Sequence, residues 1–172
     1  MNAEISQKIK RLVLTGMLFA TAIVLSVVED LIQLPLVAPG VKLGLANIVV
    51  MYTLFFLGGR TALLVSVLKS YFVFITRGLV ASILSLCGGL LSIVIMLLLL
   101  KIFKDRVSYL VLSISGSICH NLGQLIVVSL IYSGLIWIVH LPILLISGVL
   151  AGTATATLLK VFLPAFKKLD LK

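Results

Sequence analysis

Polar side chains suited to ligand binding gather in the second half of the chain. Four of them are spaced four, three and four residues apart: Ser113, Ser117, His120 and Gln124. This spacing places them on one face of a helix, and Asn121 adds a second amide beside the imidazole. A lone histidine is more often a packed, hydrogen-bonded residue than a ligand-binding one. The combination of His120, Asn121 and Gln124 within two turns is therefore what predicts a binding face.

Two cations lie in or beside the apolar stretch 61–76. Lys69, near its middle, is too deep to reach water easily, so this lysine must be paired or face a hydrated pocket. Glu29, a main-chain carbonyl group and a ligand are all open as its partner. Arg77 follows the stretch, where it could hold a carboxylate or phosphate through two parallel hydrogen bonds. An anchor at the membrane interface is the alternative for Arg77.

A segment marked by proline and glycine, PGVKLGLAN at residues 39–47, leads into another apolar stretch. Its glycines permit close approach of the backbone to a ligand. Asn47 offers an amide and Lys42 a cation, although a lysine that anchors the loop by reaching toward water is an equal alternative. The acidic pair Glu29 and Asp30 precedes this segment, and Glu29 could pair with one of the nearby cations.

The chain around these residues is too apolar for a soluble domain. Of its 172 residues, 62% are hydrophobic and 11% are charged, and the mean hydropathy is +1.32. Soluble domains have about 45–50% apolar and about 25% charged residues, so lipid must be the solvent for most of this surface. The composition excludes a soluble globular enzyme and predicts a single integral membrane domain over residues 1–172.

Six apolar stretches, separated by glycine, proline and charged residues, predict an all-α bundle of six transmembrane helices. Their expected bounds are Arg11–Val28, Leu43–Leu57, Thr61–Thr76, Leu79–Leu100, Tyr109–Tyr132 and His140–Phe162. The second and third are short, because a spanning helix needs about 20 residues. We therefore expect these two helices beside a locally thin or hydrated region.

Basic residues outnumber acidic ones 14 to 5, which gives a formal charge of +9. In a membrane protein such an excess indicates orientation, because basic loops stay on the cytoplasmic side. With both termini inside, 11 of the 14 basic residues face the cytoplasm. The sequence therefore predicts a multi-pass membrane protein with cytoplasmic termini and no nucleic-acid partner. The basic N-terminal segment lacks a small-residue cleavage site, and we expect it to be retained.

Motifs for catalysis and for metal binding are missing from the sequence. It has no Gly-x-x-x-x-Gly-Lys-Ser/Thr loop for phosphate, and Asp30, Asp105 and Asp170 are isolated from one another, which disfavours a site for Mg²⁺ and a diphosphate. Cys87 and Cys119 have no Cys-x-x-Cys partner. We therefore expect a protein that is not an enzyme and that uses no metal or cofactor.

Small residues four positions apart occur in the first and last apolar stretches. Gly148 and Gly152 form one such pair, and Gly16 and Ala20 form another. Small residues at this spacing let membrane helices approach closely. Packing within the bundle is the default interpretation, and docking onto a partner protein is the alternative.

Three features carry a resemblance to a known family: PGVKLGLAN at residues 39–47, Gly78, and SICHNLGQ at residues 117–124. Over nearly its whole length the chain resembles the bacterial Gx transporter family, also called heptaprenyl diphosphate synthase component I. That family is in turn similar to the S components of energy-coupling-factor (ECF) transporters. The resemblance implies a six-helix bundle in the bacterial plasma membrane that captures a scarce nutrient or precursor outside the cell. It also implies docking on a T component driven by two ATPase subunits.

The resemblance further implies that the first helix meets the T component through an Ala-x-x-x-Ala motif. Gly16 and Ala20 occupy the two positions here, with glycine in place of the first alanine.

Residues and resemblance together predict a binding subunit with an outward-facing pocket for a small anionic molecule. The polar residues expected in it are Glu29, Lys42, Asn47, Lys69, Arg77, His120, Asn121 and Gln124. Its apolar walls are expected from Tyr71, Phe72 and Phe74. The family's label suggests an isoprenoid or quinone precursor as substrate, such as an aromatic carboxylate. The alternatives are a membrane accessory subunit of a heptaprenyl diphosphate synthase and a purely structural membrane scaffold.

Overall fold

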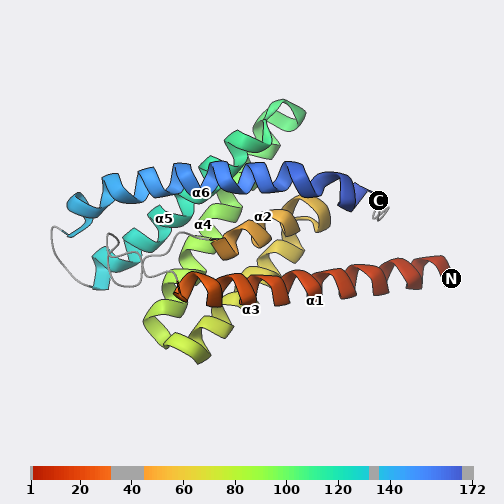
Figure 1. Ribbon diagram of the computed structural model, residues 1–172, viewed down its shortest axis with the longest axis horizontal. Helices are drawn as coiled ribbons and strands as arrows, with labels where there is room; N and C mark the ends of the chain where they lie inside the picture. The colour runs from red at the N-terminus through yellow and green to blue at the C-terminus, as the bar shows by residue number, and fades with distance from the viewer. Residues whose placement is uncertain (1, 32–44, 132–135, 168–172) are drawn as a thin grey trace.

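The computed structural model describes residues 2–31, 45–131 and 136–167, and over these residues the chain is helical without strands. Six α-helices and one turn of 3₁₀ helix follow each other along the chain (Figure 1). They are α1 (Asn2–Leu31), α2 (Leu45–Leu57), α3 (Gly59–Arg77), α4 (Leu79–Phe103), η1 (Lys104–Arg106), α5 (Tyr109–Ile131) and α6 (Ile136–Lys167). The helices begin and end near the predicted bounds, and α1 and α6 are longer because helix continues beyond the purely apolar residues.

Five of these helices, α1 and α3 to α6, are long and apolar enough to cross a membrane. The chain is thus a multi-pass membrane protein, all-helical over the residues that the structure describes, as its composition predicted. Helix α2 has 13 residues, which makes it about 20 Å long, shorter than the roughly 30 Å hydrocarbon core of a bilayer. Six full membrane crossings therefore stay a prediction, and so does the orientation of the termini.

Helix α2 lies between α1 and α6 in the middle of the bundle (Figure 1). Most of its described side chains are buried, from Val50 and Thr53, which are fully enclosed, to Leu57 at its end, and Phe55 and Phe56 are half-buried. The Tyr52 hydroxyl donates a hydrogen bond to the main-chain oxygen of Leu158 on α6, at 3.1 Å. A short apolar helix without a polar face is stable when it is buried by its neighbours, and α2 is such a helix.

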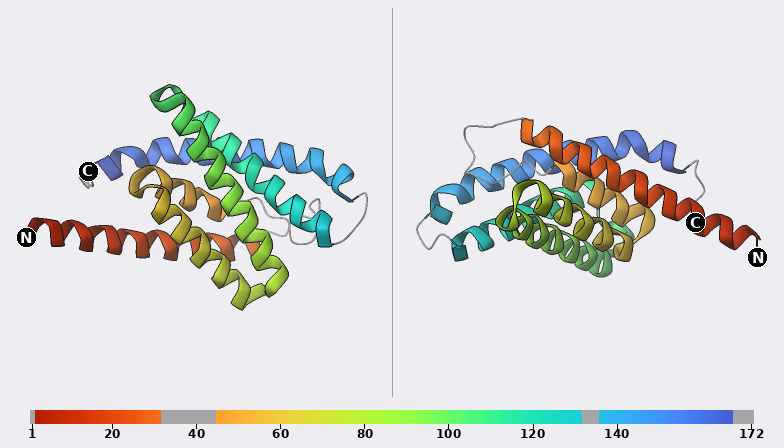
Figure 2. Two further views of the ribbon diagram at one scale, coloured as in Figure 1. Left: turned by 180° about the vertical axis from the view of Figure 1, so that it is seen from behind. Right: turned by 90° about the horizontal axis from the view of Figure 1, so that it is seen from below.

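Single glycines make the tight connections on either side of α3. Gly58 joins α2 to α3 with φ +88°, and Gly78 joins α3 to α4 with φ +86°. Residues other than glycine rarely adopt a positive φ, so each of these two glycines permits a reversal of the chain within one residue. The α3–α4 hairpin formed in this way projects from one side of the molecule, and α4 then crosses the bundle obliquely (Figure 2).

Glycines also bring α4, α5 and α6 close together. A Cβ atom built on Gly123 of α5 would lie 2.9 Å from the Cα of Gly88 on α4, and one on Gly152 of α6 would lie 2.5 Å from the Cα of Ile114 on α5. Both distances are far below ordinary van der Waals contact, so no larger residue fits without a backbone shift. The small pair Gly148 and Gly152 therefore serves helix packing within the bundle, as its spacing predicted.

Candidate functional site

A cavity of about 70 Å³ lies where α1, α3 and α5 approach their last turns and α2 and α4 begin. It is lined by Ser26, Glu29, Ala46, Lys69, Val73, Arg77, Ala81, Ser85, His120 and Gln124. Five of the eight residues that the sequence predicted for a binding pocket are in this set. The polar side chains that are expensive to place in a membrane are thus concentrated at one end of the bundle.

Helical periodicity explains why these residues converge. On α3, Lys69, Val73 and Arg77 are spaced by four residues, so all three lie on the face that borders the cavity. On α5, His120 and Gln124 follow the same rule. Each remaining long helix of the cavity also contributes one face, with Ser26 and Glu29 on α1 and Ala81 and Ser85 on α4. Ala46 at the start of α2 completes the lining.

Arg77 joins α3 to the end of α1. Its Nη2 atom donates hydrogen bonds to the main-chain oxygen of Ser26 at 2.9 Å and to the Ser26 hydroxyl at 3.1 Å. The negative charge of Glu29 interacts favourably with the guanidinium. Part of the hydrogen-bonding capacity of Arg77 is thus used to hold the two helices together at the cavity wall.

Lys69 is the cation that lies deepest in the bundle, with 4% of its surface exposed. Glu29 is close enough to interact with it electrostatically. Within the part of the chain that the structure describes, however, no hydrogen bond or ion pair closes on its ammonium group. Of the partners that the sequence left open for Lys69, Glu29 thus supplies long-range attraction, and Lys69 is among the residues that line the cavity.

His120 and Gln124 are also buried, and each has an atom without a hydrogen-bonding partner in the described structure. These atoms are Nδ1 of the imidazole and Oε1 of the amide. Gly88 of α4 lets the imidazole lie against the helix backbone, because a Cβ atom there would be 2.9 Å from Nδ1. Most buried polar atoms in proteins are hydrogen-bonded, so the Gln124 amide oxygen, whose residue lines the cavity, is available to a ligand or to ordered water.

Two predicted pocket residues instead connect helices. The Asn47 amide nitrogen donates to the Ser92 hydroxyl on α4 at 3.3 Å. The Asn121 amide nitrogen donates to the main-chain oxygen of Leu144 at 2.9 Å and to the Ser147 hydroxyl at 3.1 Å, both on α6. Neither asparagine is among the residues that line the cavity. Asn121 points elsewhere because it is about 100° around α5 from His120.

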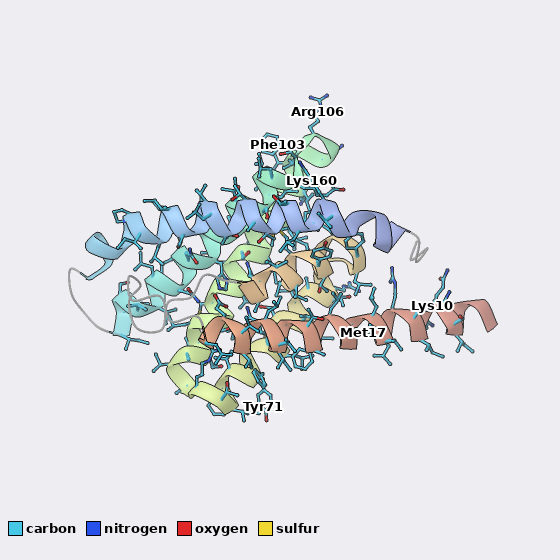
Figure 3. All side chains as sticks on the ribbon, viewed as in Figure 1. Lys10, Met17, Tyr71, Phe103, Arg106 and Lys160 are labelled. Atoms are coloured by element: carbon cyan, nitrogen blue, oxygen red, sulfur yellow. The ribbon has the colours of Figure 1, made fainter. Side chains whose placement is uncertain are left out.

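The prediction that Tyr71 and Phe74 form apolar walls of the pocket is wrong. Their side chains are 63% and 45% exposed, and they stack on each other with ring centroids 6.5 Å apart. Figure 3 shows Tyr71 directed away from the bundle. The apolar lining comes instead from the small residues Ala46, Val73 and Ala81. Neither does Phe72 line the cavity, because only every fourth residue of α3 faces it.

Ser26 and Ser85 line the cavity and were not predicted. Ser26 lies three residues before Glu29 on α1, so its helical spacing from that acid was a usable signal. The Ser85 hydroxyl accepts a hydrogen bond from the Ser70 hydroxyl of α3, with 3.3 Å between the two oxygens. Serine is common in membrane helices as a packing residue, and the spacing of Ser26 four residues after Ala22 predicts that packing role rather than a place in a binding site. The predicted pocket residue Lys42 lies outside the described residues.

The predicted docking residues Gly16 and Ala20 lie on the exposed face of α1. A Cβ atom on Gly16 would meet nothing within 4 Å. Met17, on the same stretch, also points outward (Figure 3) and is 63% exposed. This face is available to lipid or to a partner, and docking there stays a prediction.

Metal-binding clusters are absent from the described residues, where no three His, Cys, Asp or Glu side chains come together. Cys87 and Cys119 are free thiols. The chemistry of the cavity is therefore that of two cations, one acid, an imidazole, an amide and two hydroxyls, which together suit reversible binding of a polar ligand.

Comparison with protein families matches residues 18–162 to heptaprenyl diphosphate synthase component I. The chain belongs to this family. The match runs from α1 to α6, so it includes every helix that lines the cavity. The resemblance seen in the sequence is thereby confirmed for this family. No curated protein and no solved structure matched the chain.

Proposed function

We propose that this chain is a membrane-embedded binding subunit that holds a small anionic molecule in the cavity between α1, α3, α4 and α5. The observation that carries the proposal is Lys69, a buried cation beside the cavity with no hydrogen bond or ion pair among the described residues. A buried charge is costly unless it is paired and hydrogen-bonded. A bound anion supplies both.

The neighbours of Lys69 support this assignment. Arg77 adds a second cation at the cavity wall, and Gln124 offers an amide oxygen that no protein group occupies in the described structure. Intramembrane charged residues usually face a cavity and mark a binding or transport path. A purely structural bundle gains nothing from collecting such side chains around an empty volume.

The distribution of basic residues supports a cavity near the outer surface. Lys10, Arg106 and Lys160 lie in the half of the molecule that holds the start of α1 and the end of α6 (Figure 3), whereas the cavity is lined by the end of α1 and the end of α3. Basic residues favour the cytoplasmic side. We therefore place both termini inside and the cavity in the outer half of the bundle.

Two kinds of partner fit such a subunit. The family's description favours a heptaprenyl diphosphate synthase, of which this chain would be the membrane component. The outward position that we assign to the cavity favours uptake, with the chain as the S component of an ECF-type importer and α1 docking on a T component. In both cases the chain binds and a partner supplies catalysis or energy.

Mass spectrometry of the small molecules retained by the detergent-purified chain tests the binding function. We expect an anion to co-purify with the wild-type protein and to be lost from Lys69→Met, with affinity lowered about 10- to 100-fold, because charge-assisted hydrogen bonds contribute about 1.5–3 kcal/mol. The matched control is Lys101→Met, which removes an exposed lysine from the last turn of α4. A retained ligand that is neutral or cationic contradicts the proposal.

Co-purification distinguishes the partners. A soluble prenyltransferase that stays bound to the tagged chain supports the synthase component. A T component with two ATPases supports the uptake subunit, and Met17→Arg on the exposed face of α1 should then release them. A chain that binds no anion before or after substitution of Lys69, Arg77 or His120 would be a scaffold.

A further inference from the structure

We infer that the cavity selects a singly charged carboxylate with a hydroxyl group next to it, and that it discriminates against diphosphate groups. This inference rests on the proposed anion-binding function and names the chemical class of the ligand. Three properties of the described lining lead to it: its net charge, its unused hydrogen-bonding atoms and its size.

The net charge favours a single negative charge on the ligand. Among the described lining residues, Lys69 and Arg77 are cations, Glu29 is an acid, and the formal sum is +1 with His120 counted as neutral. A monoanion neutralises this set. A diphosphate would add two or more negative charges without partners, and uncompensated charge is strongly unfavourable in a low-dielectric interior.

The unpaired acceptor in the lining favours a donor on the ligand. Oε1 of Gln124 is an acceptor without a partner in the described structure, and a carboxylate alone has no hydrogen to donate to it. A hydroxyl group next to the carboxylate donates to Gln124 and also accepts from a neighbouring donor.

The size of the cavity fits this fragment. A cavity of about 70 Å³ holds on the order of five water molecules, since each needs roughly 10–15 Å³ by this measure. The proposed fragment consists of a carboxylate, the next carbon and its hydroxyl oxygen. Its number of non-hydrogen atoms is similar to the number of water molecules that the cavity holds. A single phosphate group would also fit by size, so charge disfavours only a diphosphate, which brings two or more negative charges.

Binding of lactate, propionate and inorganic pyrophosphate to the full-length chain in lipid nanodiscs tests the inference. Lactate carries the predicted fragment, and propionate is the same acid without the hydroxyl group. We expect lactate to bind, propionate to bind about tenfold more weakly because Gln124 stays unpaired, and pyrophosphate to bind more weakly than lactate. Gln124→Leu should make the affinities for lactate and propionate equal, whereas Lys101→Met should leave their ratio unchanged.

The outcomes separate this inference from the proposed function. If pyrophosphate binds more tightly than lactate in a manner that depends on Lys69, the chain is an anion-binding subunit and the inference is wrong. If lactate and propionate bind equally to the wild-type protein, the hydroxyl group has no role and the inference is also wrong. If none of the three binds to protein that unfolds cooperatively, both the inference and the proposed function fail.

Discussion

Substitution of Gly152 by alanine tests the close contact between α5 and α6. The added Cβ atom would lie 2.5 Å from the Cα and 2.9 Å from the main-chain nitrogen of Ile114. Both atoms belong to the backbone of α5, so a change of side-chain rotamer cannot relieve the clash. The two helices must separate, and the contacts around them are weakened.

The magnitude follows from comparison with two other glycines in helices. Alanine in place of glycine raises intrinsic helix stability by about 1 kcal/mol at each position, so this gain cancels in the comparison. Gly16→Ala meets nothing within 4 Å, whereas Gly148→Ala meets the Cα of Ile118 at 3.1 Å. Overpacking costs about 1–3 kcal/mol, and we expect Gly152→Ala to be less stable than Gly16→Ala by about that amount, with Gly148→Ala in between.

Equilibrium unfolding in mixed detergent micelles measures the three variants on one scale. The predicted order of stability is Gly16→Ala above Gly148→Ala above Gly152→Ala. If Gly152→Ala is as stable as Gly16→Ala, then α5 and α6 are not in backbone contact at Ile114. The bundle described here would then be wrong at the helix that carries His120 and Gln124.

Two further substitutions separate structural from binding roles. Tyr52→Phe removes the hydrogen bond from α2 to the main-chain oxygen of Leu158 and should lower the free energy of unfolding by about 1 kcal/mol. The control, Tyr71→Phe, changes an exposed ring and should leave the free energy of unfolding unchanged. Equal stability of the two variants would contradict the buried position of α2. Asn121→Leu removes two hydrogen bonds to α6 and should lower stability by about 1–2 kcal/mol without changing anion affinity. A loss of affinity in a variant that is still folded would place Asn121 in the binding site after all.

Much of the fold could be predicted because lipid constrains the sequence so strongly. Breaks in the apolar stretches, such as Gly58 and Gly78, coincide with the ends of helices. The grouping of Lys69 with Arg77, and of His120 with Gln124, could also be predicted, because residues four or eight positions apart share a helix face. Periodicity within one helix is a property of the sequence itself.

The direction in which each face points could not be predicted. The Asn121 side chain donates a hydrogen bond to the main-chain oxygen of Leu144 on α6, and Tyr71 is exposed rather than lining the cavity. Both side chains are near predicted site residues in the sequence, and both turn away because successive residues are about 100° apart around a helix. Which neighbour a face meets depends on the crossing of helices far apart in the chain.

The sequence by itself determined that the chain is a membrane protein. It also determined the approximate bounds of the helices and which side chains are too polar to face lipid. These are local properties, since hydropathy and helical spacing involve residues within a few turns of each other. Only the tertiary structure decided that Glu29, Lys69 and His120 border one cavity and that α2 is buried by its neighbours. Those facts depend on close backbone contacts such as that of Gly152 with Ile114, which bring together residues that no short-range pattern relates.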